Sequence, residues 1–282
     1  MNRYDGIIDN LLKWDNTSNI LSAVLVIGSQ ARDNHQADES SDLDIMMFVD
    51  DPDYFILFDQ WVKYMGKPYI SFTESSVDGG WKERRVLFDG ALDVDFIFLD
   101  TDLLESISNN SEIAFLLERG YRILINKIGI EQYLPRNRKL SQSGTPLSEL
   151  EFQNIINDFW FHTVWTAKKI IRGEIWTAEY CLDYYMKMKL LSVIECYELV
   201  VNGWQYDTWF RGRFIEEWAE DWIVKKLQFC YAHYNSEDIK QALLSTMDLF
   251  RLVSIDISLK LQYKYPKEAD EYATNWVTDS LN

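Results

Sequence analysis

Two aspartates at alternate positions, Asp42 and Asp44, stand at the start of an apolar run, with twelve residues between them and a Gly28-Ser29 pair. Alternate residues on a strand project to the same side, so the two carboxylates would lie a few ångströms apart. Such close negative charges cost free energy unless a cation lies between them. The pattern favours Mg²⁺, which takes oxygen ligands and keeps its other positions for water and phosphates.

A third carboxylate is expected from a later strand, either Asp95 or its neighbour on the same face, Asp93. With the first pair it would complete a site for one or two metal ions, and such sites clamp the attacking and leaving oxygens at phosphorus. Gly28 and Ser29 suit phosphate contacts, because glycine lets backbone N–H groups approach and the hydroxyl can donate. The spacing therefore predicts chemistry at a phosphate.

Strands are needed to carry these side chains. The apolar runs at 21–28 and 43–49 predict two buried strands. A two-residue Asp-Gly turn at 89–90 lies between two further β-rich runs and predicts a hairpin. In that register Arg84 faces Asp95, where it would balance the acids, reach a triphosphate or form a surface ion pair.

The rest of the chain predicts helices and one boundary. Helices are expected over 5–15 and from Pro52 to Gly66, and a strand at 121–127. The segment 130–146 has turn residues, a basic cluster and little periodicity, which indicates a domain boundary. Everything beyond is helical in pattern: roughly 147–172, 175–201, 212–234, 236–264 and a short helix after Pro266.

Acidic residues of the helical part lie away from the apolar stripe that includes Phe159. Acids and aromatic rings on an accessible helical face would suit a guanidinium-bearing or ammonium-bearing sugar, by charge pairing and stacking. A solvated helical face is the alternative. The candidates for an acceptor site are Asp158, Glu174, Glu179 and Asp183.

The overall charge restricts the classes of partner. The 282 residues carry 45 acids against 28 bases, a net charge of -17, which argues against a nucleic-acid groove. The acidity favours a cationic small molecule, or serves only to keep the protein in solution. No apolar run approaches a membrane span and no signal-peptide pattern begins the chain, so a cytoplasmic location is expected. The three cysteines and three histidines share no metal-ligand spacing.

The motif residues Gly28-Ser29, Asp42-Leu43-Asp44 and Asp95 resemble the signature of the polymerase-β-like nucleotidyltransferase superfamily. Within it, the whole chain is similar to the streptomycin-type aminoglycoside 6-adenylyltransferases. The features that carry this likeness are the motif spacing with Asn34, the Asp59-Gln60-Trp61 helix, the FDG turn before Asp95, the segments Glu151-Phe152 and Asp158-Phe159-Trp160, and LQYKYP around Pro266. One departure is Gln30, where that subfamily has arginine, so Arg32 or Arg84 is expected to supply the triphosphate contact.

The resemblance implies an α+β protein, with an N-terminal mixed-sheet nucleotidyltransferase domain over 1–135 and an all-helical acceptor-binding domain over 136–282. It implies Mg²⁺-dependent transfer of AMP from ATP to a hydroxyl of an aminoglycoside such as streptomycin, which inactivates the antibiotic and releases pyrophosphate. Two alternatives remain at this point. One is another acceptor, such as a lincosamide-like drug, a protein or RNA, and the other is a degenerate protein that only senses nucleotide.

Overall fold

The computed structural model describes residues 2–75, 81–109, 111–135 and 147–281. The chain divides into two compact units, residues 1–141 and 142–282. The predicted boundary between 135 and 136 adjoins residues 136–146, which lie outside the described residues, so it stays a prediction. The predicted α+β class is confirmed, because a mixed sheet lies in the first unit and residues 147–281 contain helices without any strand.

The first unit is built on six strands in the order β3-β4-β5-β2-β1-β6. Their bounds are β1 Ala23–Ile27, β2 Leu43–Val49, β3 Pro68–Ser75, β4 Lys82–Phe88, β5 Leu92–Asp100 and β6 Arg122–Asn126. Within the described residues, β2 and β5 are the only strands that pair in parallel, and the other four pairings are antiparallel. The central strands β1, β2 and β5 are almost wholly buried, as their continuous apolar runs predict.

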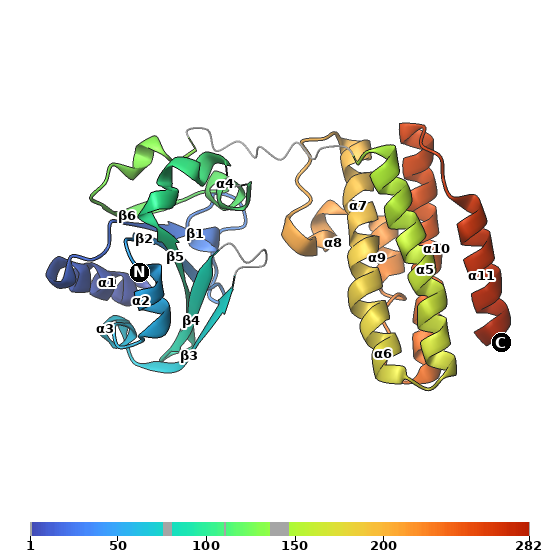
Figure 1. Cartoon of the computed structure of the whole chain (residues 1–282), viewed down its shortest axis with the longest axis horizontal. Coiled ribbons are helices and arrows are strands. Elements are labelled where there is room, and N and C mark those ends of the chain that lie inside the picture. Colours follow the sequence, from blue (N-terminus) through green and yellow to red (C-terminus); the bar gives the residue numbers. More distant parts are fainter. Residues whose placement is uncertain (1, 76–80, 110, 136–146, 282) are drawn as a thin grey trace. The chain divides into compact units, whose positions relative to one another are not determined.

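Helices cover both faces of this sheet (Figure 1). On one face α1 (Asp5–Ser18), α2 (Pro52–Leu57) and α3 (Val62–Met65) enclose a core with Trp14, Phe55 and Trp61. On the other face the 3-10 segment Thr101–Asn109 and α4 (Ser111–Glu118) pack on the alternate strand residues. The helix predicted from Pro52 to Gly66 is therefore two short helices, and β3 has no counterpart among the predicted strands.

The hairpin register differs from the predicted one by one residue. Phe88 pairs with Leu92, so the loop contains three residues, Asp89 to Ala91, rather than two. Gly90 and Ala91 both take positive φ, 76° and 53°, and a longer loop of this kind shifts the whole ladder. The prediction that Arg84 faces Asp95 is consequently wrong. Arg85 takes that position.

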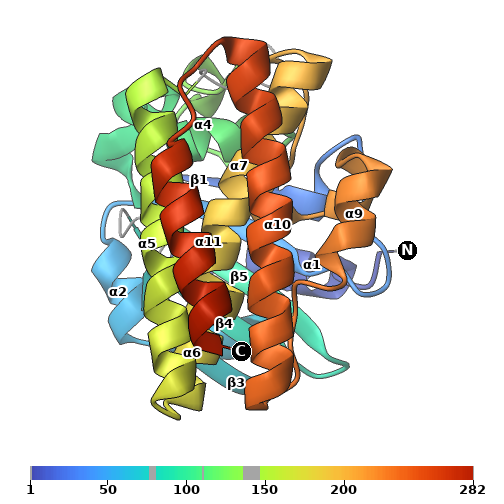
Figure 2. The ribbon, with the colours of Figure 1, turned by 90° about the vertical axis from the view of Figure 1, so that its right-hand side faces the viewer.

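The second unit is a helical bundle. Its α-helices are α5 Glu149–Ile171, α6 Ile175–Tyr180, α7 Lys187–Asn202, α8 Ile215–Trp218, α9 Asp221–Leu227, α10 Ser236–Leu261 and α11 Lys267–Leu281. A π-helical turn, Cys181–Met186, joins α6 to α7. Figure 2 shows α11 lying along α5 and α10. The helix expected to be short after Pro266 is thus 15 residues long.

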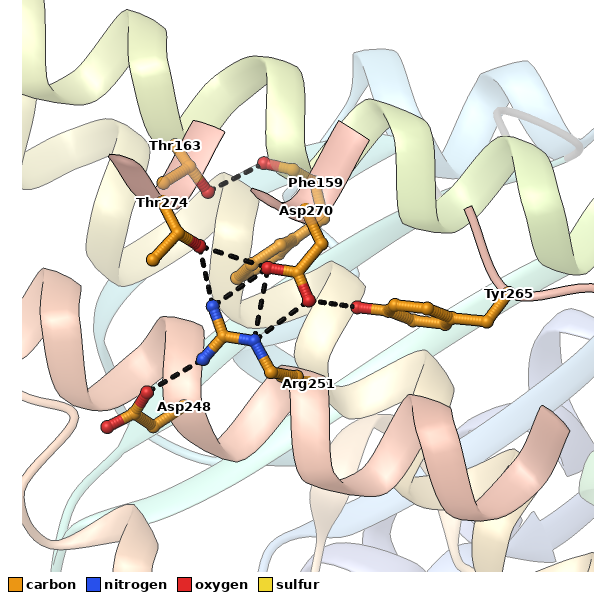
Figure 3. Close-up of polar contacts among 7 residues, drawn as sticks. All are labelled: Phe159, Thr163, Asp248, Arg251, Tyr265, Asp270 and Thr274. Carbon is orange, nitrogen blue, oxygen red and sulfur yellow. Dashed lines mark hydrogen bonds and ion pairs between the residues drawn. The ribbon is translucent and has the colours of Figure 1, made fainter. Parts of the chain in front are cut away.

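An ion pair and stacked rings hold this bundle together. Phe159 of α5 stacks on Phe250 of α10 with ring centroids 3.6 Å apart. Next to them Arg251 of α10 donates to both carboxylate oxygens of Asp270 on α11, at 2.8 to 3.0 Å (Figure 3). Tyr265 donates to the same carboxylate. Because Asp270 is only 6% exposed, its charge requires these partners.

None of the helices in the described part of the chain is both long enough and apolar enough to cross a bilayer.

Candidate active site

Three carboxylates meet at one end of the sheet. Asp44 on β2 and Asp95 on β5 are direct partners in the parallel ladder, and Asp42 lies two residues before Asp44 on the same face. One oxygen from each of the three lies within 4.8 Å of the others. Strand alternation places Asp42 and Asp44 on one face, and parallel pairing brings Asp95 beside them, so the three carboxylates could hold a divalent cation.

The Gly28 turn fits closely against this cluster. Gly28 follows β1 with φ of +66°, and a Cβ at this position would lie 2.1 Å from Oδ2 of Asp44. Any other residue would clash with the carboxylate and strain the backbone. The motif therefore requires glycine at position 28, because the turn passes so close to the Asp44 carboxylate.

Asp95 is the most buried of the three acids, at 9% exposure. Burial raises its pKa to about 6, although the Arg85 guanidinium opposes the shift and the Asp42 carboxylate adds to it. Nη2 of Arg85 lies 3.3 Å from Oδ2 of Asp95, and Nε of the same side chain lies 2.6 Å from Glu74. Arg85 thus connects the acidic cluster to the edge strand β3.

Arg84 lies on the opposite face of the sheet, because neighbouring strand residues alternate. Its Nε donates to the carbonyl of Phe55 at 3.1 Å, Nη2 donates to the carbonyl of Ile56, and Nη1 donates to Ser71. The side chain is 7% exposed. The structure therefore separates Arg84 from the carboxylates and uses it to hold α2 on the sheet.

Ser29 and Arg32, two of the predicted nucleotide-binding residues, line a hollow of 460 Å³ beside the Gly-Ser turn, together with Tyr121 and Arg122. The buried hydroxyl of Ser29 has no hydrogen-bond partner among the described residues. Nε of Arg32 donates to the carbonyl of His35 at 2.7 Å. Arg122, which the sequence did not single out, makes no side-chain hydrogen bond or ion pair within the described part of the chain.

A second close contact places β6 against this hollow. Gly120 has φ of +139°, and a Cβ there would lie 2.5 Å from the carbonyl oxygen of Ala31. The chain can approach the Gly-Ser turn this closely only without a side chain at 120. Tyr121 and Arg122 follow directly, which is how residues distant in sequence come to line the hollow.

Three of the four predicted acceptor residues are paired with cations inside the helical unit, and the pairs of Asp158 and Glu174 are the closest. Asp158 contacts His162 and Lys189, each at 2.7 Å, and accepts from Tyr185. Burial would raise the pKa of Asp158, but the hydrogen bonds from Lys189 and Tyr185 hold it below its usual range.

Glu174 is paired in the same way. It contacts Lys169 at 2.6 Å and also Arg172. Hydrogen bonds from these two side chains lower the pKa of Glu174. Like Asp158, it already has cationic partners within the bundle.

Glu179 and Asp183 lie one turn apart, before and within the π-helical turn. Burial and the neighbouring Asp183 carboxylate raise the pKa of Glu179 to about 7. Nζ of Lys187, a buried side chain, lies 3.4 Å from Asp183 and donates to Thr246. Asp183 and Lys187 both line a cavity of 630 Å³ in this unit, together with Tyr184 and Tyr231.

Sequence reasoning missed Arg85, Arg122 and Lys187. Arg85 was missed because its position depends on a single step of hairpin register. The position of Arg122 beside the hollow depends on the close approach of the chain at Gly120. The position of Lys187 depends on the wider spacing of a π-helical turn. The only local signal for Arg122 was its position as a basic residue directly after the first residue of the expected strand.

A family model described as streptomycin adenylyltransferase matches residues 1–280 of the chain. An aminoglycoside 6-adenylyltransferase from Campylobacter jejuni is 24% identical over 280 residues, which cover 96% of this chain and 93% of that protein. The Bacillus subtilis (strain 168) enzyme of the same name is 23% identical over 261 residues, 90% of this chain and 89% of that one.

Among solved structures, an aminoglycoside 6-adenyltransferase from Bacillus subtilis covers 99% of both chains at 19% identity, with a TM-score of 0.46. A spectinomycin adenyltransferase from Enterococcus faecialis, solved with ATP and spectinomycin, covers 93% of this chain and 100% of that one at 10% identity, with a TM-score of 0.33. The family match spans nearly every residue and includes all three carboxylates. The chain therefore belongs to the streptomycin adenylyltransferase family and is an aminoglycoside 6-adenylyltransferase-like nucleotidyltransferase.

Proposed function

We propose that this protein transfers AMP from ATP to a hydroxyl group of an aminoglycoside such as streptomycin, with release of pyrophosphate. The observation that carries the proposal is the cluster of Asp42, Asp44 and Asp95 next to the Gly28 turn, in a chain whose family model spans 280 residues. Transfer of this kind would inactivate the antibiotic.

The donor set suits Mg²⁺. Three carboxylates offer oxygen ligands within 4.8 Å of one another, and Gly28 leaves no side chain between the turn and Asp44. When bound, the ion would neutralise the charge of the triphosphate and polarise the phosphorus under attack. Asp95 is suited to receive the proton of the attacking hydroxyl, because burial raises its pKa to about 6 and so makes it a stronger base than a solvated carboxylate.

The nucleotide phosphates would lie against the Gly-Ser turn. Support comes from the Ser29 hydroxyl, which has no hydrogen-bond partner in the described part of the chain, and from Arg32 and Arg122 around the same hollow. Two guanidinium groups and a hydroxyl together form an anion site, which is unusual in a chain of net charge -17. We assign Arg122 to this site in place of Arg84, because the guanidinium of Arg84 is bound to backbone carbonyls on the other face.

For the acceptor, we favour Asp183 and Glu179 over Asp158 and Glu174. The second pair binds lysine side chains at 2.6 to 2.7 Å, whereas the one ion pair of Asp183, with Lys187, is longer at 3.4 Å, so a cationic drug would displace a closer partner from Asp158 or Glu174 than from Asp183. Asp183 lines the 630 Å³ cavity beside two tyrosines, which suits an ammonium-bearing or guanidinium-bearing ring. That volume lies in the range of small-molecule sites.

The decisive experiment incubates the protein with Mg²⁺, ATP and streptomycin, and follows pyrophosphate release together with the mass of the drug. We expect an AMP-sized gain in mass. Asp44→Asn should lower the rate roughly a thousandfold, as loss of a charged group that acts on the transition state does. Asp9→Asn, an exposed substitution on α1, serves as the control and should retain the wild-type rate.

The alternatives give different results in this assay. Pyrophosphate release with another antibiotic, but none with streptomycin, would keep the chemistry and replace the acceptor. ATP binding without turnover of any acceptor would refute the transferase proposal in favour of nucleotide sensing. If the protein is a transferase as proposed, Asp183→Asn should raise KM for streptomycin more than Asp158→Asn does.

A further inference from the structure

Three consecutive residues near the start of the chain, Asn2, Arg3 and Tyr4, reach the two segments that lead into the carboxylate strands. One segment, residues 37–42, precedes β2. The other is the turn at 89–91 before β5. Because β2 and β5 are parallel, both segments lie at the same end of the sheet, next to the carboxylates.

Arg3 contacts both lead-in segments with a single guanidinium group. Nη1 donates to the carbonyl of Glu39, in the segment before β2. Nη2 donates to the carbonyls of Gly90 and Ala91, at 2.8 and 3.3 Å, in the turn before β5. A planar fork with several donors suits such a bridge between separate carbonyl groups.

Tyr4 makes a second link between the same two segments. Its ring is fully buried in the core beneath the sheet. Its hydroxyl lies 2.9 Å from the carbonyl of Ser41 and 3.2 Å from Oδ1 of Asp93, two residues before Asp95. The single hydrogen of this hydroxyl is shared between the two acceptors. Both contacts raise the free energy needed to move the start of either strand.

Asn2 reaches the cluster through one intermediate residue. Its Nδ2 donates to Oε1 of Gln30 at 2.7 Å, and Nε2 of Gln30 donates to the backbone carbonyl of Asp42 at 3.1 Å. Gln30 follows Ser29 directly, so this chain of bonds connects the Gly-Ser turn to a carboxylate residue. The carboxamide of Gln30 uses both its oxygen and its nitrogen in this way.

We propose that Asn2, Arg3 and Tyr4 are positioning residues that clamp the two lead-in segments together and so set the spacing of the three carboxylates for a divalent cation. Ladder hydrogen bonds hold the bodies of β2 and β5, but Asp42 precedes the first residue of β2. Its position depends on side-chain bonds to the segment before the strand. An error of about 1 Å in such a group can cost roughly a hundredfold in rate. The catalytic consequence rests on the proposed function.

The test compares Arg3→Gln and Tyr4→Phe with the wild-type chain. The control is Lys13→Gln, which removes one positive charge from an exposed position of α1. Three quantities are measured: binding of Mn²⁺ to the protein alone by calorimetry, amide hydrogen exchange over residues 37–42, and kcat of AMP transfer. Substitution of residues that hydrogen-bond to metal ligands, without touching the metal themselves, typically weakens metal binding about 10- to 100-fold.

We expect Arg3→Gln to weaken Mn²⁺ binding about tenfold, to speed exchange over 37–42 and to lower kcat more than it raises KM for ATP. Tyr4→Phe should act in the same direction by a smaller factor, since it removes one hydroxyl. Arg3→Lys keeps the charge without the fork and should recover only part of the Mn²⁺ affinity. Lys13→Gln should match the wild type in all three measurements.

Mn²⁺ affinity and exchange equal to wild type in Arg3→Gln would overturn the clamp. Faster exchange with unchanged Mn²⁺ affinity would also overturn it, because the three residues would then only hold the loop. Wild-type protein that binds Mn²⁺ without modifying streptomycin would count against the proposed acceptor alone, and the Mn²⁺ affinities would still decide the clamp. Absence of Mn²⁺ binding to the wild type would refute the clamp as a device for metal binding, whereas the proposed function would still be decided by the mass of streptomycin.

Discussion

Acidic side chains serve different purposes in the two units. In the first unit Asp42, Asp44 and Asp95 present their oxygens to one another within 4.8 Å. In the helical unit Asp158 and Asp270 present theirs to a lysine or an arginine at 2.7 to 3.0 Å. The first arrangement places three negative charges close together. In the second, each negative charge is balanced by a neighbouring lysine or arginine.

This difference separates acids that await a ligand from acids that support the fold. Like charges held close together lower stability unless a cation joins them. A buried acid paired with arginine has no such demand, and its removal leaves an uncompensated charge behind. Substitutions in the first set should therefore affect chemistry, and substitutions in the second set should affect stability.

Of the three further substitutions that test this difference, Gly28→Ala is expected to have the largest effect. The new methyl group would lie 2.1 Å from Oδ2 of Asp44, so the carboxylate must move and the transfer rate should fall roughly a hundredfold. The matched control is Gly129→Ala, which has a similar φ of +68° but nearest contact at 3.6 Å. Both variants should lose about 1 kcal/mol of stability to backbone strain. Equal loss of rate in both would remove the special role of Gly28.

An intermediate effect is expected from Asp270→Asn, this time on stability. The substitution leaves the Arg251 guanidinium without its buried counter-charge, which should cost roughly 3 kcal/mol in urea unfolding. Asp248 also contacts Arg251, but its side chain is 68% exposed, so Asp248→Asn should change little. A similar loss in both variants would show that the buried pair is not the support of α11.

The smallest effect concerns Glu195, an acid of α7 that fits neither class. Burial raises its pKa from the ordinary 4.5 to about 7. Between these pH values the folded chain keeps a proton that the unfolded chain loses, so stability falls as pH rises through this window. Glu195→Gln should therefore raise Tm, relative to wild type, by on the order of a few degrees at pH 8 and by less at pH 5.

Thermal unfolding at the two pH values measures this difference. Glu271→Gln, an exposed surface substitution, should shift Tm by the same small amount at both. A Glu195 variant that behaves like this control would mean that the burial of Glu195 carries no stability cost above pH 7.

Much of the scaffold could be predicted because it depends on local patterns. The strands at 43–49 and 122–126 and the long helices α5 and α10 follow from apolar periodicity and turn residues. The edge strand β3 was not predicted. Its apolar and polar residues alternate only over 70–73, and the strand is exposed along almost its whole length. Periodicity is informative only where one face of an element is buried.

The register of the β4–β5 hairpin could not be predicted from local sequence patterns. The Asp-Gly signal located the turn correctly but not its length, and one extra loop residue exchanged Arg84 for Arg85 beside Asp95. Each of the two arginines then has a different environment: one holds α2 on the far face and the other meets the acids. Local sequence could not choose between them, since both registers use the same residues.

The sequence by itself determined the α+β class, the two carboxylates that share a strand face, and the glycine that precedes them, because these depend on alternation and on residues a few positions apart. Only the tertiary structure decided which arginine meets Asp95, that Gly120 brings Arg122 to the Gly-Ser turn, and that Arg3 and Tyr4 link the two lead-in segments. The physical reason is that these contacts join segments far apart in the chain. Their geometry depends on strand register and packing, which no short stretch of sequence contains.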